Sequence, residues 1–543
     1  MYLTMNFPAI SVRHYLRTIF FCIGSILLVA MSARAQQGYT NPVLRGMNPD
    51  PSIVRVGEDF YMVTSSSYLY PGVPVYHSRD LVHWQMIGYC LTRGPQFFTE
   101  KNHFAPNMYA ATLRYNKGVF YMITTDVAGG GNFFVTATNP AGPWSDPVQI
   151  DQAVFDPSLF FDEDKVYYTR RGDFANKDIV QAEIDITTGR LLTPLRSISK
   201  GLVSDDTEGP HLFKRNGWYY LTMGEGGSRN LHMQTIARAR SPWGPFEADP
   251  ANPVIAQHHA QWHHIRSLGH ADFLDAADGS SWAVCLGTRH AAYGDFSAIG
   301  RETFLMPVEW IDDWPVVKPE YRYYLQVPMH TLPPQPWPEP PARDDFDSDT
   351  LNLKWNLLAY PRQPLYSLTA RRGTLRLKGT ASPLKENRQT AFIGTRQKEM
   401  TGSHAAAFRF EPVAASEEAG LTAFQSGNYH YDLFVTLRNG RKVAVLRKTV
   451  GDIVAEAASV PVQGDHYEMK IDFDNVNYHF FIRQGKWVEL GKGLVNLVST
   501  EVADVWSGMF LGLYSTGNGK DCRNPADFYW CEDVFTELLL KDN

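Results

Sequence analysis

The sequence is poor in cysteine and has no excess of positive charge. Only 5 of its 543 residues are cysteine, and no Cys-x-x-Cys pair or Cys/His cluster indicates a zinc site. Lys and Arg number 51 against 57 Asp and Glu, a net charge of −6. The chain therefore lacks the basic footprint of a nucleic-acid-binding protein. After one apolar run near the N-terminus, no stretch is long enough to predict a membrane span.

The N-terminal apolar run lies in a segment that has the order of a secretory signal. Arg13 and Arg17 precede the apolar residues 19–31, and Ala33-Arg34-Ala35 has the small-residue form of a cleavage site. A buried N-terminal helix is the alternative interpretation. We expect residues 1–35 to be a signal peptide that exports the protein to the periplasm or the medium.

Few cysteines would remain in the exported chain. Cys522 and Cys531 bracket a short loop that contains Asn and Pro, and they could form a disulfide in an oxidising compartment. Their spacing alone does not establish this pairing.

Aromatic and turn-forming residues are abundant. The chain contains 13 Trp, 27 Tyr, 31 Phe, 42 Gly and 34 Pro. Because aromatic residues favour strands and Gly and Pro favour turns, this composition predicts short strands and many turns rather than long helices. Charged residues make up 20% and apolar residues 44% of the chain, which is typical of a globular protein.

A strand–turn–strand pattern recurs five times in the first three hundred residues. Each copy places an aromatic residue in an apolar patch directly after a polar turn, as expected of a β-hairpin. The aromatic residues are Tyr61, Tyr121, Tyr167, Tyr219 and, shifted by one position, Trp282. Units repeated in this way predict the blades of a propeller, because each buries its faces only against its neighbours. An irregular β domain is the alternative.

The repeat brings acidic residues into register. Counting back eleven residues from each of the four tyrosines, and from Ser281 in the fifth copy, reaches Asp50, Ala110, Asp156, Glu208 and His270. Equivalent positions in radially arranged blades lie at equivalent distances from the axis, so these residues should surround one central pocket. A single Asp before Pro is more simply a turn residue, but three acids in one register indicate a functional site.

Three carboxylates at one pocket suggest two kinds of chemistry. In glycoside hydrolysis, one carboxylate activates water while a protonated carboxylic acid donates to the leaving oxygen, and a third acid can raise the pKa of the donor. The other possibility is a cation site made of oxygen ligands. The residues alone favour hydrolysis modestly.

Several motifs resemble those of a known enzyme family. The segments Asn-Pro-Asp-Pro-Ser at 48–52, Phe-Asp-Pro-Ser-Leu at 155–159 and Thr-Glu-Gly-Pro-His at 207–211 resemble the three catalytic motifs of glycoside hydrolase family 43. The resemblance extends over nearly the whole exported chain and includes residues 72–84, 269–270 and 300–303. It implies a five-bladed β-propeller that hydrolyses glycosides with inversion, followed by the accessory domain of the β-xylosidase group.

The same resemblance assigns roles to individual residues. It implies that Asp50 is the general base, Glu208 the general acid, and Asp156 a residue that orients the acid and modulates its pKa. Arg301 matches an arginine that contacts the sugar. His270 matches a histidine often associated with bound calcium and its waters, so a structural calcium ion is possible, although the chemistry requires no cofactor.

The sequence differs from those of the β-xylosidases at positions that we expect to border the pocket. This chain has Phe104-Ala105-Pro106-Asn107 where they usually carry Trp-Ala-Pro-Asp, and Tyr70 lies in a loop where they tend to show bulkier aromatics. We take Phe104 and Tyr70 as candidate sugar contacts. We predict an exo-acting enzyme that releases non-reducing-end α-L-arabinofuranosyl residues from plant hemicellulose or its oligosaccharides. The alternatives are a β-D-xylosidase or bifunctional enzyme, an endo-arabinanase with an open groove, and a non-catalytic carbohydrate-binding propeller.

A second domain follows a proline-rich segment. Six prolines lie within residues 332–341, which predicts a semi-rigid linker at 331–343 between a propeller at 36–330 and a second domain at 344–543. Alternating strands in this second part, with Asn439-Gly440 as a hairpin signal, predict a β-sandwich. Trp506 is our candidate for a pocket wall contributed by this domain, and a place in the sandwich core is the alternative.

Overall fold

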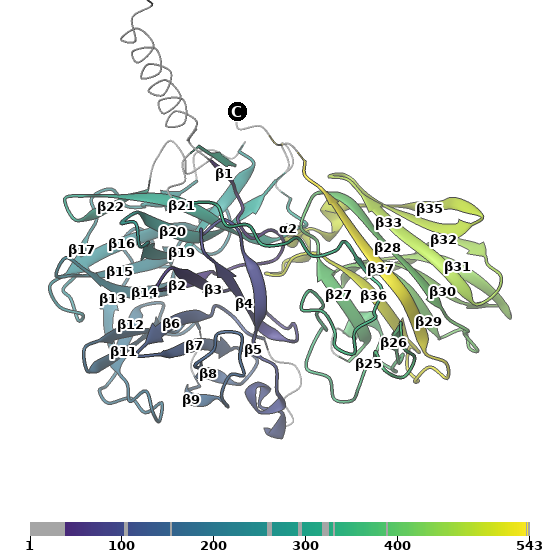
Figure 1. The fold of residues 1–543 in the computed structure, drawn as a ribbon, viewed down its shortest axis with the longest axis horizontal. Coiled ribbons are helices and arrows are strands. Elements are labelled where there is room, and N and C mark those ends of the chain that lie inside the picture. Colours follow the sequence, from purple (N-terminus) through teal and green to yellow (C-terminus); the bar gives the residue numbers. More distant parts are fainter. Residues whose placement is uncertain are drawn as a thin grey trace, which may run out of the picture.

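The computed structural model describes residues 38–101, 107–152, 155–257, 263–290, 296–317, 325–328, 332–386, 389–538 and 540. The predicted signal peptide and the candidate contact Phe104 lie outside these residues. The described chain folds into two β-rich parts that lie side by side (Figure 1). No helix among the described residues is both long and apolar enough to cross a membrane.

The N-terminal part consists of five antiparallel sheets in which consecutive strands pair with one another. The first two sheets are β2 (Ser52–Val56), β3 (Asp59–Val63), β4 (Gly72–Ser78) and β5 (Gln85–Leu91), then β6 (Thr112–Asn116), β7 (Val119–Asp126), β8 (Gly131–Ala137) and β9 (Val148–Asp151). The third is β10 (Ser158–Asp162), β11 (Lys165–Arg171), β12 (Ile179–Glu183) and β13 (Arg196–Ser199). The last two are β14 (Thr207–Arg215), β15 (Trp218–Glu225), β16 (Met233–Ala239), β17 (Glu247–Ala248) and β18 (Ile255–Ala256), then β19 (Ile265–Asp275), β20 (Ser281–Arg289), β21 (Arg301–Ile311) and β22 (Trp314–Val317).

These sheets form a closed ring. The first strand of each sheet contacts the first strand of the next, from β2 through β6, β10 and β14 to β19, and β19 contacts β2 again. Apolar clusters fill the space between neighbouring sheets; for example, Ile53 and Phe60 of the first pack with Trp282 and Val284 of the fifth. Each blade therefore buries both faces against its neighbours. The predicted five-bladed propeller is confirmed.

A short pair of strands joins the two ends of the propeller. Strand β1 (Tyr39–Thr40) pairs with β23 (Gln326–Val327). The described residues 332–342 that follow contain no strand or helix. The backbone N–H of Gln335 donates to Asp80 of the first blade, so this proline-rich segment lies against the propeller.

The C-terminal part is a sandwich of two antiparallel sheets, as predicted. One contains β24 (Arg343–Asp344), β25 (Tyr366–Ser367), β26 (Leu375–Leu377), β28 (Thr401–Arg409), β33 (His466–Phe473), β34 (Asn477–Gln484), β35 (Lys486–Leu494) and β37 (Ala526–Thr536). The other contains β27 (Ala391–Arg396), β29 (Glu418–Ser426), β30 (Tyr429–Arg438), β31 (Arg441–Val450), β32 (Ile453–Pro461) and β36 (Phe510–Thr516). Short helical turns are η1 (Gly94–Phe97), η2 (Thr99–Lys101), η3 (Leu384–Glu386), η4 (Val495–Val498) and α2 (Thr500–Ala503).

Local sequence explains the hairpin of the second sheet. Asn439 and Gly440 are the two residues between β30 and β31, and their φ angles are 51° and 74°. Positive φ at both positions is what a two-residue type I′ turn requires, and Asn-Gly accepts it at the least steric cost.

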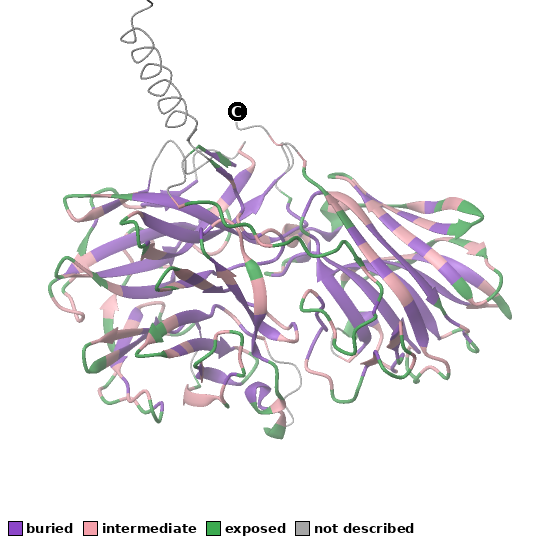
Figure 2. Ribbon diagram, viewed as in Figure 1, coloured by how far each residue is buried: buried purple, intermediate pink, exposed green. Residues whose placement is uncertain are grey.

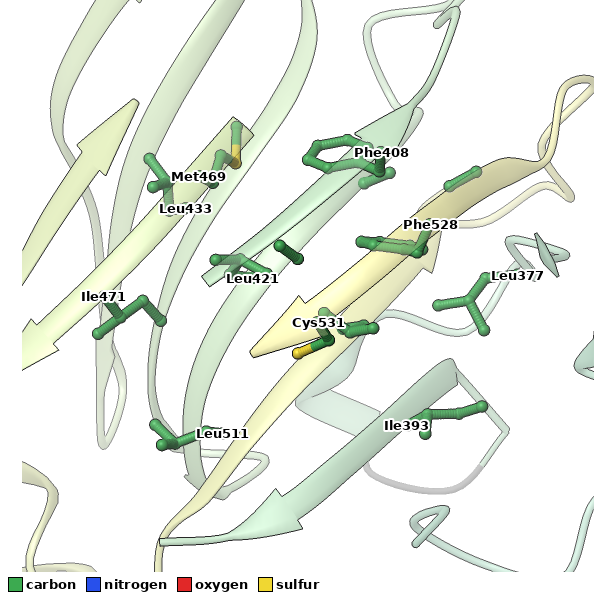
Figure 3. Close-up of a cluster of buried hydrophobic side chains, with 14 of the residues drawn as sticks. Leu377, Ile393, Phe408, Leu421, Leu433, Met469, Ile471, Leu511, Phe528 and Cys531 are labelled. Carbon is green, nitrogen blue, oxygen red and sulfur yellow. The ribbon is translucent and has the colours of Figure 1, made fainter. Parts of the chain in front are cut away.

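The sandwich core lies between its two sheets. Figure 3 shows Phe408, Met469 and Phe528 of one sheet near Leu421 and Leu433 of the other. All of these side chains are fully buried. Figure 2 shows buried residues along most strands of both domains, whereas β32 is largely exposed.

The cysteine pairing considered above does not form. All four described cysteines are free thiols. The Cys531 side chain is buried in the sandwich core, where its sulfur lies 3.8 Å from Nδ1 of His404. The sulfur of Cys522 instead lies 3.9 Å from the Ser515 hydroxyl oxygen. The two residues bracket one loop, but the strand that carries Cys531 turns its side chain inward and away from Cys522.

Candidate active site

All five positions predicted from the register line one cavity of about 780 Å³. Asp50, Ala110, Asp156, Glu208 and His270 are all part of its wall. Asp50, Ala110 and Asp156 lie just before the first strand of their blades, and Glu208 and His270 lie within it. The ring of inner strands brings these positions to the same depth. The repeat in the sequence thus placed the acidic cluster correctly.

The backbone at three of these positions is in an unusual conformation. Asp50, Asp156 and His270 have φ angles of 54°, 58° and 48°. The left-handed region costs a non-glycine residue of order 1 kcal/mol and persists only where the surrounding structure enforces it. Here the strand that follows is held in the closed ring of blades. The two aspartates are therefore aimed into the cavity at a conformational cost, which is characteristic of functional sites.

Two glycines in the recognised motifs make room for imidazole rings. A Cβ atom on Gly209 would lie 2.7 Å from Cε1 of His270, and one on Gly269 would lie 2.6 Å from Cε1 of His232. Both distances are shorter than any van der Waals contact allows. The glycine after Glu208 and the glycine before His270 are thus required for packing around the acids.

Asp50 is held by a cation and a hydroxyl group. Arg301 donates from Nη1 to Oδ1 of Asp50 over 2.9 Å, and Ser65 donates from Oγ to Oδ2 over 2.6 Å. Only 5% of Asp50 is exposed. Both oxygens therefore have fixed partners, and the guanidinium pairs with the charged form of the carboxylate.

Asp156 and Glu208 form a coupled acidic pair. Burial raises the pKa of Asp156 well above its ordinary value, and the negative charges of Glu208 and Asp50 raise it further. Burial also raises the pKa of Glu208, but hydrogen bonding and charge from His232 outweigh it and lower this pKa to about 2. Neighbouring buried carboxyls titrate as a pair, so a change at one of these two residues alters the pKa of the other.

The sandwich domain supplies part of the cavity wall. Residues 504–507, which follow α2, line the cavity together with Arg301. The Trp506 carbonyl accepts a hydrogen bond from Nη2 of Arg301, and its ring lies near the guanidinium of Arg229, 5.0 Å from centroid to Cζ. Arg229 also forms an ion pair with Asp504. Because Trp506 is 40% exposed, it is not part of the sandwich core.

Tyr70 does not reach the cavity, so its assignment as a sugar contact is corrected. Its ring packs edge-on against Phe97 and Tyr360, 5.5 and 5.1 Å between centroids, at the contact with the second domain. Its backbone pairs with Leu357 of the sandwich. Tyr68, two residues earlier in the same loop, lines the cavity instead.

Sequence reasoning missed three side chains that contact the acids. Ser65 binds Asp50, Ser228 donates to Oε1 of Glu208 over 2.9 Å, and His232 Nε2 lies 3.3 Å from the same Oε1. All three lie in the segments between the second and third strands of their blades, β3–β4 and β15–β16. These segments return to the end of the blade where the inner strand begins. The strand–turn–strand repeat therefore already indicated that their residues could contact the acids.

The side chains around His270 offer few ligands for calcium, so an ion there would be held mainly by water. Calcium takes six to eight oxygen ligands, whereas the Asp50 Oδ1 atom near His270 lies 3.9 Å from Nδ1 and is already bound to Arg301. Among the described residues, His270 belongs to no group of three or more side chains with metal-ligating spacing. Burial lowers the pKa of His270, which suits a neutral ring packed against Gly209.

Comparison with known proteins agrees with this geometry. A family model described as glycosyl hydrolases family 43 matches residues 39–315, and one described as the β-xylosidase C-terminal concanavalin A-like domain matches residues 343–532. Together these matches cover most of the propeller and of the sandwich.

Individual relatives are similar over nearly their whole length. A non-reducing end α-L-arabinofuranosidase of Bacteroides ovatus, BoGH43B, is 42% identical over 93% of this chain and 96% of its own. A xylosidase/arabinosidase of Butyrivibrio fibrisolvens is 33% identical over 90% and 98%. A solved structure titled Bacteroides ovatus Xyloglucan PUL GH43B superimposes with a TM-score of 0.88 and 40% identity, covering 92% of this chain and all of that one.

Proposed function

This chain belongs to glycosyl hydrolase family 43, and from that premise we propose that it releases terminal α-L-arabinofuranosyl residues from plant hemicellulose or its oligosaccharides. The observation that carries the proposal is three buried carboxylates around one cavity that residues 504–507 close on one side. A cavity closed on one side accepts the end of a chain rather than its middle. The open groove of an endo-arabinanase is therefore not favoured.

The contacts of the three acids support a division of roles. Asp50, paired with Arg301, is available in its charged form to take a proton from the attacking water. Glu208 donates a proton to the leaving oxygen, and Asp156, the neighbouring buried carboxyl, orients the acid and modulates its pKa. We propose an inverting reaction, in which water and leaving group lie on opposite faces of the sugar.

The preference for arabinofuranose over xylose is part of the proposal. The names of the relatives include both arabinofuranosidase and xylosidase activities, so a β-D-xylosidase or bifunctional enzyme acting on xylo-oligosaccharides is the second candidate. The relative with 42% identity favours arabinofuranose, as do the sequence differences from the β-xylosidases.

Two further expectations concern the setting of the reaction. We propose that residues 1–35 direct export to the periplasm or the medium, on the evidence of their charged, apolar and small-residue regions. We also propose that hydrolysis requires no metal ion, because side chains supply both the acid and the base. The aryl arabinofuranoside assay repeated after dialysis against EDTA should then give an unchanged rate.

Rates on aryl α-L-arabinofuranosides and aryl β-D-xylosides test the proposed activity. We expect the wild-type protein to release the phenol faster from the arabinofuranoside. Glu208→Gln should lose about 10²- to 10⁴-fold on a poor leaving group and much less on a good one, since only the former needs a proton. Asp50→Asn should lose activity on both.

The outcomes separate the alternatives. No release from either glycoside would identify a non-catalytic binding propeller, and faster release from the xyloside would reverse the preference. Proton NMR of the first sugar released should show the inverted anomer, and a retained anomer would contradict the proposed roles of Asp50 and Glu208.

A further inference from the structure

His232 lies directly behind the general acid. It precedes β16, its side chain is fully buried, and its Nδ1 lies 3.1 Å from the carbonyl oxygen of Ser267. Because a carbonyl oxygen only accepts, Nδ1 must carry a hydrogen. The other ring nitrogen, Nε2, lies 3.3 Å from Oε1 of Glu208, and with Nδ1 protonated it can donate a hydrogen to Oε1 only in the doubly protonated imidazolium form.

Both close partners of Glu208 engage the same oxygen. Ser228 donates to Oε1 over 2.9 Å, and His232 Nε2 approaches Oε1 as well. Among the described residues no hydrogen bond is made to the other oxygen, Oε2. Since Glu208 lines the cavity, Oε2 is the oxygen from which a proton can pass to a bound glycoside.

The imidazole ring is fixed in place by two residues without side chains. A Cβ atom on Gly224 would lie 3.3 Å from Nε2 of His232, and one on Gly269 would lie 2.6 Å from Cε1. The ring thus fills a space bounded by two strands, β15 and β19, and cannot shift without displacing backbone. Because the His232 ring is fixed, it can fix the position of the flexible Glu208 side chain.

From these contacts we infer that His232 is a positioning residue for the general acid. In its imidazolium form, and together with Ser228, it donates to Oε1 of Glu208, so that the protonated Oε2 points at the leaving oxygen. The proton moves from Oε2 to that oxygen as the glycosidic bond breaks, and water gives its own proton to Asp50. The inference rests on the proposed function of Glu208 and adds a residue that does not line the cavity.

The leaving group decides whether this positioning matters. A strongly acidic phenol departs without a proton, whereas a weakly acidic one requires proton transfer in the transition state. Misdirecting Oε2 should therefore slow only the second reaction, whereas a general loss of structure should slow both. This contrast separates a positioning role from a merely structural one.

Kinetics of His232→Ala and His232→Gln on 2,4-dinitrophenyl and 4-methoxyphenyl α-L-arabinofuranoside test the inference. We expect His232→Ala to lower kcat about 10- to 100-fold on the methoxyphenyl glycoside and less than about threefold on the dinitrophenyl glycoside. His232→Gln should recover part of the loss, because its amide N–H can donate to Oε1. An equal fall on both substrates would overturn the inference.

A matched control and a second readout complete the test. His77→Asn removes an imidazole that contacts a carboxylate, Asp59, 2.7 Å away outside the cavity, and both rates should stay unchanged. The His232→Gln substitution should remove part of the effect by which His232 lowers the pKa of Glu208. Asp156, Asp50 and His270 still face the acid in this variant. The basic limb of kcat/KM should therefore move to higher pH.

Failure of the inference differs from failure of the proposed function. If the wild-type protein released neither phenol, the glycosidase proposal itself would fall. If wild type is active but the basic limb of His232→Gln coincides with that of wild type, His232 does not act on the acid.

Discussion

At the scale of single residues, the site brings together three acidic side chains that are almost fully buried. Asp50 and Asp156 are each 5% exposed and Glu208 is 9% exposed. Because charged carboxylates repel one another and lose hydration on burial, the pKa of Asp156 is raised. The sequence identified which acids would meet, but the lowered pKa of Glu208 depends on His232, which only the folded chain brings near.

Replacing Asp156 with Asn should stabilise the fold while lowering activity. The pKa of Asp156 is raised in the folded protein, so the unfolded chain loses the proton at lower pH. Wild-type stability therefore falls as pH rises from about 4 through the folded-state pKa. Asn does not titrate, and the variant should gain stability over wild type, by about 1 kcal/mol or more at pH 8.

Urea denaturation at pH 5 and pH 8 measures this difference. Ser158→Ala serves as a control, because Ser158 is a buried neighbour on β10 without a titratable group. A gain in Asp156→Asn that is larger at pH 5 than at pH 8 would contradict the raised pKa.

At the scale of elements, strand starts and loops have different functions. The acids lie at the starts of the inner strands, and the segments between the second and third strands carry the side chains that hold them, such as Ser65 and Ser228. The hydrophobic and turn pattern predicted the strands well, since each hairpin depends on local sequence. It did not predict that Tyr68 rather than Tyr70 would reach the cavity, because a one- or two-residue difference in a loop leaves no periodic signal.

Trp506→Ala should weaken substrate binding more than it slows the chemistry. Its ring lies beside Arg229 and Arg301 at the cavity wall and offers an apolar face to a sugar. We expect KM on an arabino-oligosaccharide to rise about tenfold, which corresponds to about 1.4 kcal/mol, with kcat changed less than about threefold.

Trp487→Ala is the matched control for this loop. Trp487 lies on β35 and packs near Lys470 and Arg483, away from the cavity, so its replacement should leave KM unchanged. A Trp506→Ala variant with wild-type KM on oligosaccharides would show that this loop does not bind substrate.

At the scale of the whole molecule, buried ion pairs join the two domains. Arg289 of the last blade donates to Glu302 over 2.7 Å in its own domain and to Glu399 of the sandwich over 3.0 Å. All three side chains are buried. A buried charge that loses its partner is strongly destabilising, so this cluster ties the segment between β27 and β28 of the sandwich to the propeller.

Glu399→Ala should therefore destabilise the protein by about 3 kcal/mol. The free energy of unfolding in urea, followed by tryptophan fluorescence, measures the loss. Asp465→Ala is the matched control, because its pair with Arg409 is largely exposed and should contribute less than about 1 kcal/mol. Equal effects of the two substitutions would show that the interdomain pair does not stabilise the protein.

The sequence by itself determined the blades, the acids and the two-domain organisation. Strand patterns, turns and the register of the repeat are local properties, and a closed ring of equivalent units converts register into spatial proximity. Only the tertiary structure decided the rest: which loop residue faces the cavity, how His232 reaches Glu208, and how Trp506 closes the pocket from another domain. These contacts join residues far apart in the chain, and no local pattern encodes their distances.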